Sequence, residues 1–413
     1  MKPKFPLILL AFLPVIAHAS TIIVGPEVYD YAGIQAAIDA ASSGDLIEVH
    51  KGTYYENVDI DKTLTLKGVG LPVVDAGSSG NAITLSADGI RLEGFKVANA
   101  AAAGIRVTSN DNIVLRNIAT ENGNEGIILI NSRNNTILNN DARNNHHGIS
   151  IINSNDNLLS GNSAAYNKRV GFIIKNSLNN TLSANTANNN SGRGFHIETS
   201  MYSIITGNEI NDNHWEGIRI LKSHHNNITY NNARNNDDGL TLFRSSNTTV
   251  EGNYLHHNRW NGICLDAFCN NTKISDNNFS HNNLMGISIS ISKENLITGN
   301  SIFHNGEDGL QLMFCSNSTI YRNYIAGNAE GSRFIPKNSD LKGTLLNLLS
   351  WILLKNVGDN VYDSSSNKWD NGNVGNYYGD YNCEDEDNDG ICDSAYEIPG
   401  GSSIDRYPLA QMN

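Results

Sequence analysis

The chain has 413 residues, of which 17% are charged, and its formal net charge is −13. This balance argues against nucleic acid as a partner, because a phosphate backbone is bound by clustered lysine and arginine. It suits an extracellular surface or divalent cations, whereas an anionic polysaccharide would need a local basic patch or a bridging metal ion.

Residues 1–19 have the pattern of a signal peptide. Lys2 and Lys4 give a positive start, an apolar run follows, and Ala17-His18-Ala19 supplies the small residues of a cleavage site. A membrane anchor is the alternative, but the apolar run is short for a bilayer span. We therefore expect a secreted, periplasmic or cell-surface protein that starts at Ser20 and has no transmembrane span.

A repeat of about 23 residues dominates the rest of the chain. A glycine recurs at steps of 22 to 24 residues from Gly104 to Gly309, and apolar residues follow it at the first and third positions. That alternation predicts a strand with one buried face. Two asparagine columns also recur in every unit, from Asn117 to Asn323 and, five residues later, from Asn122 to Asn328. Stacked coils would let each amide side chain bond to the next, which predicts asparagine ladders at the corners.

These features predict an all-β protein, a right-handed parallel β-helix of about eleven coils over residues 20–330. A leucine-rich repeat has a similar period but would show clustered leucines and a helical half. Residues 33–42 read as a short amphipathic helix that caps the N-terminal coil. The apolar insertion 331–356 contains the run 341–355, which we expect to form a C-terminal cap helix. An interfacial helix or a protein-binding patch is the alternative for 341–355.

Several segments resemble a known family. Residues 34–41, 44–49 and 52–57 look like the start of pectin-lyase-like β-helix proteins, and the repeats resemble the NosD-like group. The tail, from Lys368-Trp369-Asp370 to Asp405-Arg406-Tyr407-Pro408-Leu409, is similar to the tails of NosD-like surface proteins. The resemblance implies a β-helix, whereas its functions range from carbohydrate binding and polysaccharide cleavage to copper-enzyme maturation.

The tail, residues 357–413, contains an acidic loop with calcium-type spacing. Carboxylates at loop positions one, three and five precede a glycine at position six. The expected ligands are Asp385, Asp387, Asp389, the Ile391 carbonyl and Asp393. A structural calcium ion is the preferred interpretation, and a solvated acidic turn is the alternative. Cys383 and Cys392 bracket this loop and are candidates for a disulfide.

The outward face of the glycine-led strands is richest in functional side chains in the central coils. Aromatic rings beside carboxylates, arginine and histidine suit a sugar chain, because rings stack on apolar sugar faces and charged groups bind hydroxyls. The expected carbohydrate-binding residues are His196, Trp215, Arg219, Phe243 and Trp260. We therefore expect a polysaccharide or cell-surface glycan as partner.

The same face leaves two other interpretations open. A polysaccharide lyase, hydrolase or epimerase would use a carboxylate pair. The candidates for such a pair are Asp237, Asp238, Glu198 and Asp266. A charged, solvated sheet face without a ligand is the other interpretation. The adjacent histidines 146–147, 224–225 and 256–257 would suit copper, but neighbouring side chains on a strand point to opposite faces.

Overall fold

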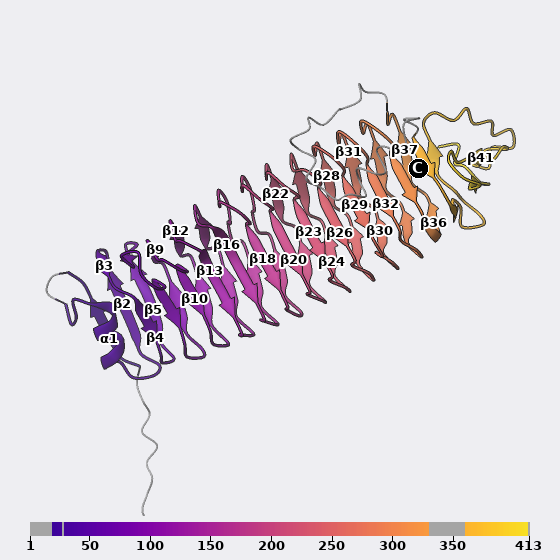
Figure 1. The fold of residues 1–413 in the computed structure, drawn as a ribbon. Helices are drawn as coiled ribbons and strands as arrows, with labels where there is room; N and C mark the ends of the chain where they lie inside the picture. Colours follow the sequence, from indigo (N-terminus) through magenta and orange to yellow (C-terminus); the bar gives the residue numbers. More distant parts are fainter. Residues whose placement is uncertain (1–18, 27–28, 330–359, 412–413) are drawn as a thin grey trace, which may run out of the picture.

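The computed structural model describes residues 19–26, 29–329 and 360–411. The signal peptide predicted over 1–19 lies almost wholly outside these ranges, as does the insertion 331–356 with its expected helix 341–355. The described chain forms one elongated right-handed parallel β-helix with three sheets along its length (Figure 1). No helix among the described residues is long and apolar enough to cross a membrane.

Each coil contributes one short strand to each of the three sheets in turn. Sheet A has fifteen strands, which are β1 (Thr21–Val24), β2 (Leu46–His50), β5 (Thr65–Val69), β8 (Arg91–Glu93), β11 (Ile113–Leu115), β14 (Thr136–Leu138), β17 (Leu158–Ser160), β19 (Thr181–Ser183), β21 (Ile204–Thr206), β24 (Asn227–Thr229), β27 (Thr249–Glu251), β30 (Lys273–Ser275), β33 (Leu296–Thr298), β36 (Ser316–Tyr321) and β39 (Ser366–Lys368). Sheet C has thirteen strands, which are β4 (Val58–Ile60), β7 (Ile83–Leu85), β10 (Ile105–Val107), β13 (Glu125–Ile130), β16 (His147–Ile152), β18 (Phe172–Lys175), β20 (Phe195–Glu198), β23 (Ile218–Leu221), β26 (Leu240–Phe243), β29 (Ile263–Asp266), β32 (Ile287–Ser290), β35 (Leu310–Met313) and β38 (Val361–Asp363).

Sheet B is divided into two parts, which isolated bridges at residues 163 and 186 connect. Its strands are β3 (Thr53–Tyr55), β6 (Val73–Asp75), β9 (Lys96–Ala98), β12 (Ile118–Thr120), β15 (Asp141–Arg143), β22 (Glu209–Asn211), β25 (Asn232–Arg234), β28 (Tyr254–His256), β31 (Asn278–Ser280), β34 (Ser301–Phe303), β37 (Tyr324–Ala326) and β40 (Tyr377–Tyr378). A small antiparallel pair, β41 (Tyr396–Glu397) and β42 (Ile404–Asp405), lies in the tail.

The thirteen strands of sheet C correct the expected count of about eleven coils. Strands β4 and β7 precede the first repeat glycine, so the glycine and asparagine columns do not mark their coils. Strands β38, β39 and β40 pair with β35, β36 and β37, so the β-helix also continues beyond the expected boundary at residue 330. The predicted N-terminal cap is present as α1 (Ile34–Ala40), which buries Ile34, Ala37 and Ile38 (Figure 1).

The asparagine columns form continuous ladders, as the repeat predicts. Asn208 shows the pattern, because its Oδ1 accepts hydrogen bonds from the backbone N–H and the Nδ2 of Asn185. Its Nδ2 donates to Asn231 Oδ1 and to the carbonyl of Leu182 on the preceding coil. The buried amide of Asn208 is thereby satisfied at both ends, and bonds of this kind hold neighbouring coils in register at the corner.

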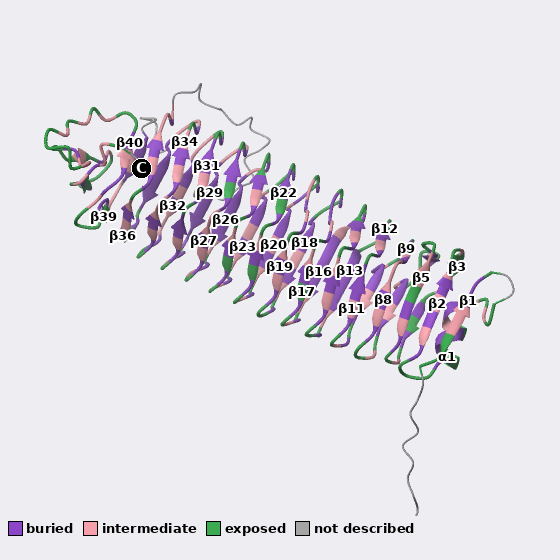
Figure 2. Ribbon diagram, turned by 180° about the vertical axis from the view of Figure 1, so that it is seen from behind, coloured by how far each residue is buried: buried purple, intermediate pink, exposed green. Residues whose placement is uncertain are grey.

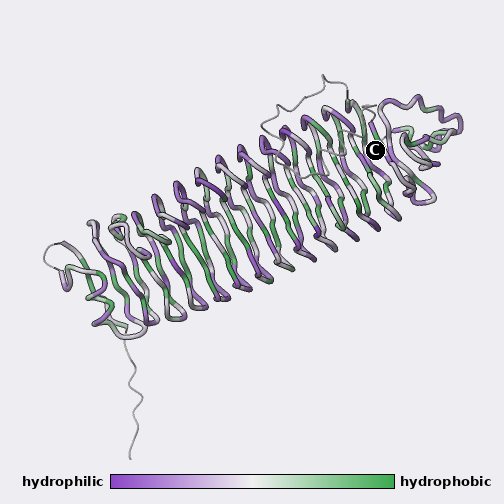
Figure 3. The backbone as a smooth tube through the Cα atoms, in the orientation of Figure 1, coloured by the Kyte–Doolittle hydropathy of each residue, from purple (hydrophilic) through white to green (hydrophobic). Residues whose placement is uncertain are grey.

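The interior is apolar and closely packed, while the corners are polar (Figures 2 and 3). The rings of Phe172 and Phe195 stack with centroids 4.7 Å apart on neighbouring coils. A Cβ atom at Gly217 would lie 2.7 Å from the carbonyl oxygen of Gly239, which explains the repeat glycine by close approach of neighbouring coils.

Candidate functional site

The outer face of sheet C carries the site predicted from the central coils. Neighbouring coils place residues in columns that run along the rod, because the strands pair in parallel without a shift. The turn entering the sheet holds the column Trp215, Asp237 and Trp260, joined by backbone hydrogen bonds from Asp237 to Trp215 and from Trp260 to Asp237. The structure therefore brings these three predicted residues together on one edge of the face.

Two arginines converge on one carboxylate beneath this edge. Glu216 accepts hydrogen bonds from Arg193 Nε at 2.7 Å and from Arg219 Nη1 at 2.5 Å. Burial acts to raise the pKa of Glu216, but the two guanidinium groups outweigh it and leave that pKa below its ordinary value. Arg193 also lies 4.7 Å from the centre of the Trp215 ring, so it links the ion pair to the exposed aromatic. Arg193 and Glu216 were not among the predicted site residues, although their positions beside the repeat glycines were visible in the sequence.

Asp237 lies between the two tryptophans and is held by Arg259. Arg259 Nε donates to Asp237 Oδ1 at 2.8 Å, and its Nη2 donates to the carbonyls of Asn213 and His214. Burial raises the pKa of Asp237, and the Arg259 charge opposes that rise. A shallow hollow lined by Asn189, Asp212, His214 and Arg259, among others, adjoins this edge.

Two of the candidate carboxylates are covered rather than presented to solvent. Asp238 is 4% exposed, and its Oδ1 accepts two hydrogen bonds of 2.9 Å from the backbone N–H and the Nδ2 of Asn261. Burial raises the pKa of Asp238 to about 7, and the nearby Glu216 and Asp237 charges act in the same direction. Asp266 is 3% exposed and accepts a hydrogen bond from Ser290 Oγ. The expectation that such positions face solvent is wrong for these short side chains, which the neighbouring coils cover.

The remaining predicted residues lie at the borders of the cluster. Glu198 pairs with Lys175 at 3.1 Å. His196 lies between the arginines and Glu198, and burial together with Arg193 and Arg219 lowers its pKa to about 4. Its Nδ1 is buried without a hydrogen-bond partner. Phe243 is partly exposed and lies under the Arg244 guanidinium at 5.3 Å.

A column of histidines lies elsewhere, on the corner between sheets B and C. His257, His281 and His304 occupy the same corner position on three successive coils, each with a left-handed backbone. The rings of His257 and His281 stack at 4.9 Å, and Nδ1 of His257 lies 2.7 Å from Nδ1 of His256. The expectation that adjacent histidines point to opposite faces is wrong at 256–257, because the chain turns at His257.

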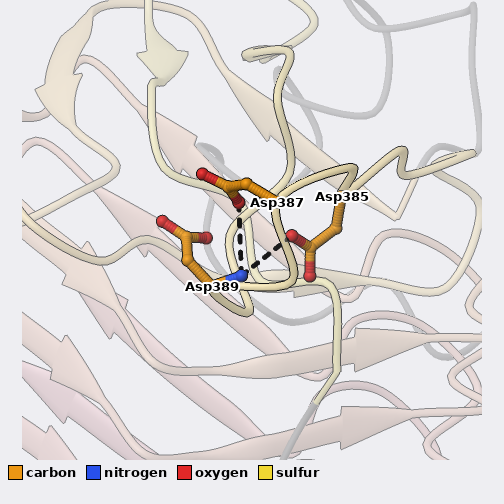
Figure 4. A group of neighbouring side chains, drawn as sticks. All are labelled: Asp385, Asp387 and Asp389. Carbon is orange, nitrogen blue, oxygen red and sulfur yellow. Dashed lines mark hydrogen bonds between the residues drawn. The ribbon is translucent and has the colours of Figure 1, made fainter.

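The acidic loop of the tail brings three carboxylates close together. Among the described residues, Asp385, Asp387 and Asp389 form the one group of three or more potential metal-binding side chains with ligand atoms within 4.8 Å of one another (Figure 4). The N–H of Asp389 donates to both other aspartates of that group. Asp393 accepts from the N–H of Glu386 across the loop, and Ile391 bridges to Leu409.

The cysteines divide into one bonded pair and three free thiols. Cys383 and Cys392 are joined by a disulfide that brackets the acidic loop. Cys264, Cys269 and Cys315 are free and buried. Burial raises the pKa of Cys269 to about 12, so this thiol is not a nucleophile at neutral pH.

Comparison with known proteins gives one family match over most of the chain. The family model described as "Periplasmic copper-binding protein (NosD)" matches residues 41–236 and 214–383. A "Cell surface glycoprotein" of Methanothermus fervidus is 41% identical over 68 residues, which are 16% of this chain and 12% of that protein. The match thus spans about an eighth of that relative, whose other properties have no bearing here.

Solved structures share the general fold. The mannuronan C-5 epimerase AlgE6 A-module of Azotobacter vinelandii has 14% identity and a TM-score of 0.48, covering 90% of each chain. A mutant of the periplasmic alginate epimerase AlgG has 18% identity and a TM-score of 0.46, covering 68% of this chain and 76% of its own. Pectate lyase Pel9A has 17% identity and a TM-score of 0.43, covering 64% of this chain and 79% of its own. Because identities and TM-scores are this low, we draw no argument about chemistry from them.

Proposed function

The chain belongs to the NosD family, and from that premise we propose that it is an exported β-helix protein whose sheet C face binds carbohydrate. One observation carries the proposal, namely that Trp215 and Trp260 lie on either side of Asp237 in one column at the edge of the face. Trp215 is 39% exposed, so part of its ring is open to a ligand. Rings of this kind offer flat apolar contacts to sugars, and the fixed carboxylate between them accepts hydroxyl hydrogen bonds.

The charge network beneath the tryptophans supports binding by a rigid surface. Glu216 is fixed by two arginines and Asp237 by a third, so the polar groups are held in place before a ligand arrives. Such preorganisation reduces the entropy lost on binding. Because each of these carboxylates already has a cationic partner, the charges largely compensate one another, which favours a neutral glycan over a polyuronate.

Affinity electrophoresis and product analysis with the chain from Ser20 would test this proposal. Xylan, glucomannan and soluble cellulose would serve as neutral polymers, and alginate and polygalacturonate as acidic ones. Retention by a neutral polymer, lost in Trp215→Ala and Trp260→Ala, is the expected result. Tyr55→Ala is the matched control, because Tyr55 is 78% exposed and lies in β3, outside the face. Equal mobility of all four proteins in every polymer would reject the proposal.

The same experiment addresses catalysis. The pairing of Asp237 and Glu198 with cations, and the burial of Asp238 and Asp266, favour binding over bond cleavage. Release of oligosaccharides, or of unsaturated products that absorb in the ultraviolet, would instead make the protein a polysaccharide hydrolase or lyase. In that event Asp237→Asn and Asp238→Asn would be the first variants to assay.

For the tail we propose a structural calcium ion held by Asp385, Asp387, Asp389, the Ile391 carbonyl and Asp393. The support is the convergence of three carboxylates within a loop that the Cys383–Cys392 disulfide closes. Oxygen ligands at this spacing suit Ca²⁺ rather than a soft metal. The proposed role is to hold together a segment that has little apolar core of its own.

Copper handling is a second candidate, favoured by the family description and by the histidine column. Two imidazole nitrogens that approach within 2.7 Å have the separation of neighbouring ligands around one small metal ion, and imidazole suits copper. In that function the protein would deliver or retain copper outside the cytoplasm, as an accessory to copper-enzyme maturation. Its site would be separate from the tryptophan edge.

A further inference from the structure

An exposed apolar row occupies the far edge of the sheet C face, opposite the tryptophans. The corner just beyond each strand of sheet C points to solvent, and on three successive coils it carries Phe268, Ile291 or Phe314. Phe268 is 57% exposed and Phe314 is 66% exposed. Backbone hydrogen bonds from Phe268 to Ile291, and from Ile291 to Met313, show that these residues lie on successive coils.

The backbone of this row is strained, its two phenylalanines are exposed and Ile291 is half-buried. Phe268, Ile291 and Phe314 have φ values of 66°, 47° and 53°, in the left-handed region that bulky and β-branched residues avoid. Six earlier coils place a polar residue at the same corner, and on three of them it is asparagine, which tolerates this conformation. The residues on these six coils are Asn131, Asn153, Asn176, Thr199, Lys222 and Arg244. Bulky apolar residues in this conformation on three successive coils, two of them exposed, at a corner where earlier coils carry polar residues, point to a selected surface rather than to a packing need.

The row is continuous with the proposed carbohydrate site across the sheet. Between the tryptophan edge and the row lie short side chains, such as Thr241 on β26, Cys264 on β29 and Ser288 on β32. The eight residue steps from Trp260 to Phe268 would extend at most about 26 Å at the rise of a β-strand, and only Ile263–Asp266 of them form the strand. Aromatic side chains therefore lie at both edges of the sheet C face, and small side chains lie between them.

We propose that Phe268, Ile291 and Phe314 form a distal contact for a polymeric glycan that crosses the sheet C face from the tryptophan edge. This inference rests on the proposed carbohydrate-binding function, and it adds that the ligand is a chain with apolar sugar faces, bound along its length. The tryptophan edge binds one end of the glycan segment, and the row stacks against sugar units further along the glycan chain.

A protein partner fits this row less well. A standard protein interface buries about 800 Å² on each partner. Two phenylalanines and one isoleucine fall short of that area, since an aromatic side chain offers at most about 150–250 Å². The flanking residues Lys222, Arg244 and Asn271 are exposed and polar, so the apolar surface does not extend along the rod.

Isothermal titration with di- and trisaccharides and with their parent polymers would test the inference. The variants are Ile291→Asn and Phe314→Asn, with Trp215→Ala for the near edge and Asn176→Phe as the reverse change on an earlier coil. For the polymer we expect both row variants to bind about tenfold more weakly, because each loses one large apolar contact. For the di- and trisaccharides we expect the row variants to bind with the affinity of the wild type, and Trp215→Ala to lose binding. Because asparagine relieves the strained backbone, the row variants should keep or raise the melting temperature.

The outcomes separate this inference from the proposed function. Wild-type polymer affinity in Ile291→Asn and Phe314→Asn, with Trp215→Ala defective, would overturn the distal contact and leave the tryptophan edge intact. Loss of short-sugar and polymer binding alike in the row variants would also overturn it, because the row would then belong to a single compact site. If the wild-type protein binds no sugar, the proposed function and this inference both fail. Association of the wild-type protein with itself, abolished by the row variants, would assign the row to a protein contact instead.

Discussion

Arg259 donates from Nε to Asp237 Oδ1 at 2.8 Å and thereby fixes this carboxylate between Trp215 and Trp260. The same guanidinium donates to the carbonyls of Asn213 and His214, so a single side chain connects three coils of the site. If these coils act as one rigid surface, removal of that guanidinium should affect ligand binding more than folding.

Arg259→Gln should therefore weaken binding to a retained polymer about threefold to tenfold. Its loss of stability should be only about 1 kcal/mol, because the arginine side chain is 42% exposed and solvent screens the ion pair. Arg143→Gln is the matched control, since Arg143 pairs with Asp141 at 3.1 Å on sheet B with similar exposure. Titration calorimetry and urea denaturation give the two quantities. Equal effects of the two substitutions on affinity would contradict a role of Arg259 in the site.

Asp238 should make the stability of the protein depend on pH. Its pKa of about 7 in the folded state lies above the ordinary value of 3.8, so the folded protein binds this proton more tightly than the unfolded one. The contribution of Asp238 to stability is full below about pH 4 and is lost as the pH rises through about 7. Asp238→Asn keeps an acceptor for Asn261 but cannot ionise. The variant should gain up to about 4 kcal/mol over the wild type between pH 4 and 8. Urea denaturation at several pH values gives the free energy of unfolding of the wild type and of Asp238→Asn. If the two free energies changed with pH in parallel, the pKa of Asp238 would not be raised in the folded protein.

The asparagine ladder should be sensitive at its interior. Asn208→Ala removes the Oδ1 acceptor used twice by Asn185 and both donations of the Asn208 amide. Because the groups left behind are buried, we expect a loss of about 3 kcal/mol or more in the free energy of unfolding. Asn227→Ala, at an exposed position of β24, should change it by less than about 0.5 kcal/mol. A similar small change at both positions in denaturant titration would refute this account of the ladder.

Calcium should stabilise the tail locally. With Ca²⁺ present, we expect slower amide exchange and proteolysis across residues 383–393, and a chelator should reverse both effects. At a hundredfold excess over the dissociation constant, the stabilisation of that segment would be about 2.7 kcal/mol. Asp387→Asn should abolish the response, whereas Asp380→Asn, an exposed residue outside the loop, should retain it. Identical exchange with calcium and with chelator would exclude a calcium site there.

Copper binding should depend on the histidine pair if the second candidate function is correct. We expect Cu²⁺ to bind the wild-type chain and to give an absorption band typical of imidazole ligation. The variants His256→Gln and His257→Gln should bind Cu²⁺ more weakly. His225→Gln is the control, because His225 lies on a different corner, between sheets C and A, and stacks on Tyr202. Equal Cu²⁺ affinity in all three variants would show that the histidine column is not the copper site.

The repeat alone determined the fold and the ladders. The spacing of glycine, alternating apolar residues and paired asparagines left one architecture, because identical positions on stacked coils must share one environment. The coils at both ends could not be predicted from this repeat, because β4, β7 and β38 lack its glycine and asparagine pattern. Only their pairing with neighbouring strands shows that they belong to the β-helix. Columns in the sequence also predicted which residues share the face, namely Trp215, Asp237 and Trp260.

The tertiary structure alone decided how exposed and how charged those residues are. Strand alternation assigns Asp238 and Asp266 to the outside, but side chains on adjacent coils about 4.8 Å away cover them. The pairing of Glu216 with Arg193 depends on which side chain on one coil reaches its neighbour on the next. The pairing of Glu216 with Arg219 and the contact of His256 with His257 depend on how the turns place residues that are close in the chain. The sequence by itself thus determined the backbone path and the columns. Burial and the ion pairs of Arg193 with Glu216 and of Arg259 with Asp237 were decided by contacts between coils, because those contacts join residues more than twenty positions apart in the chain.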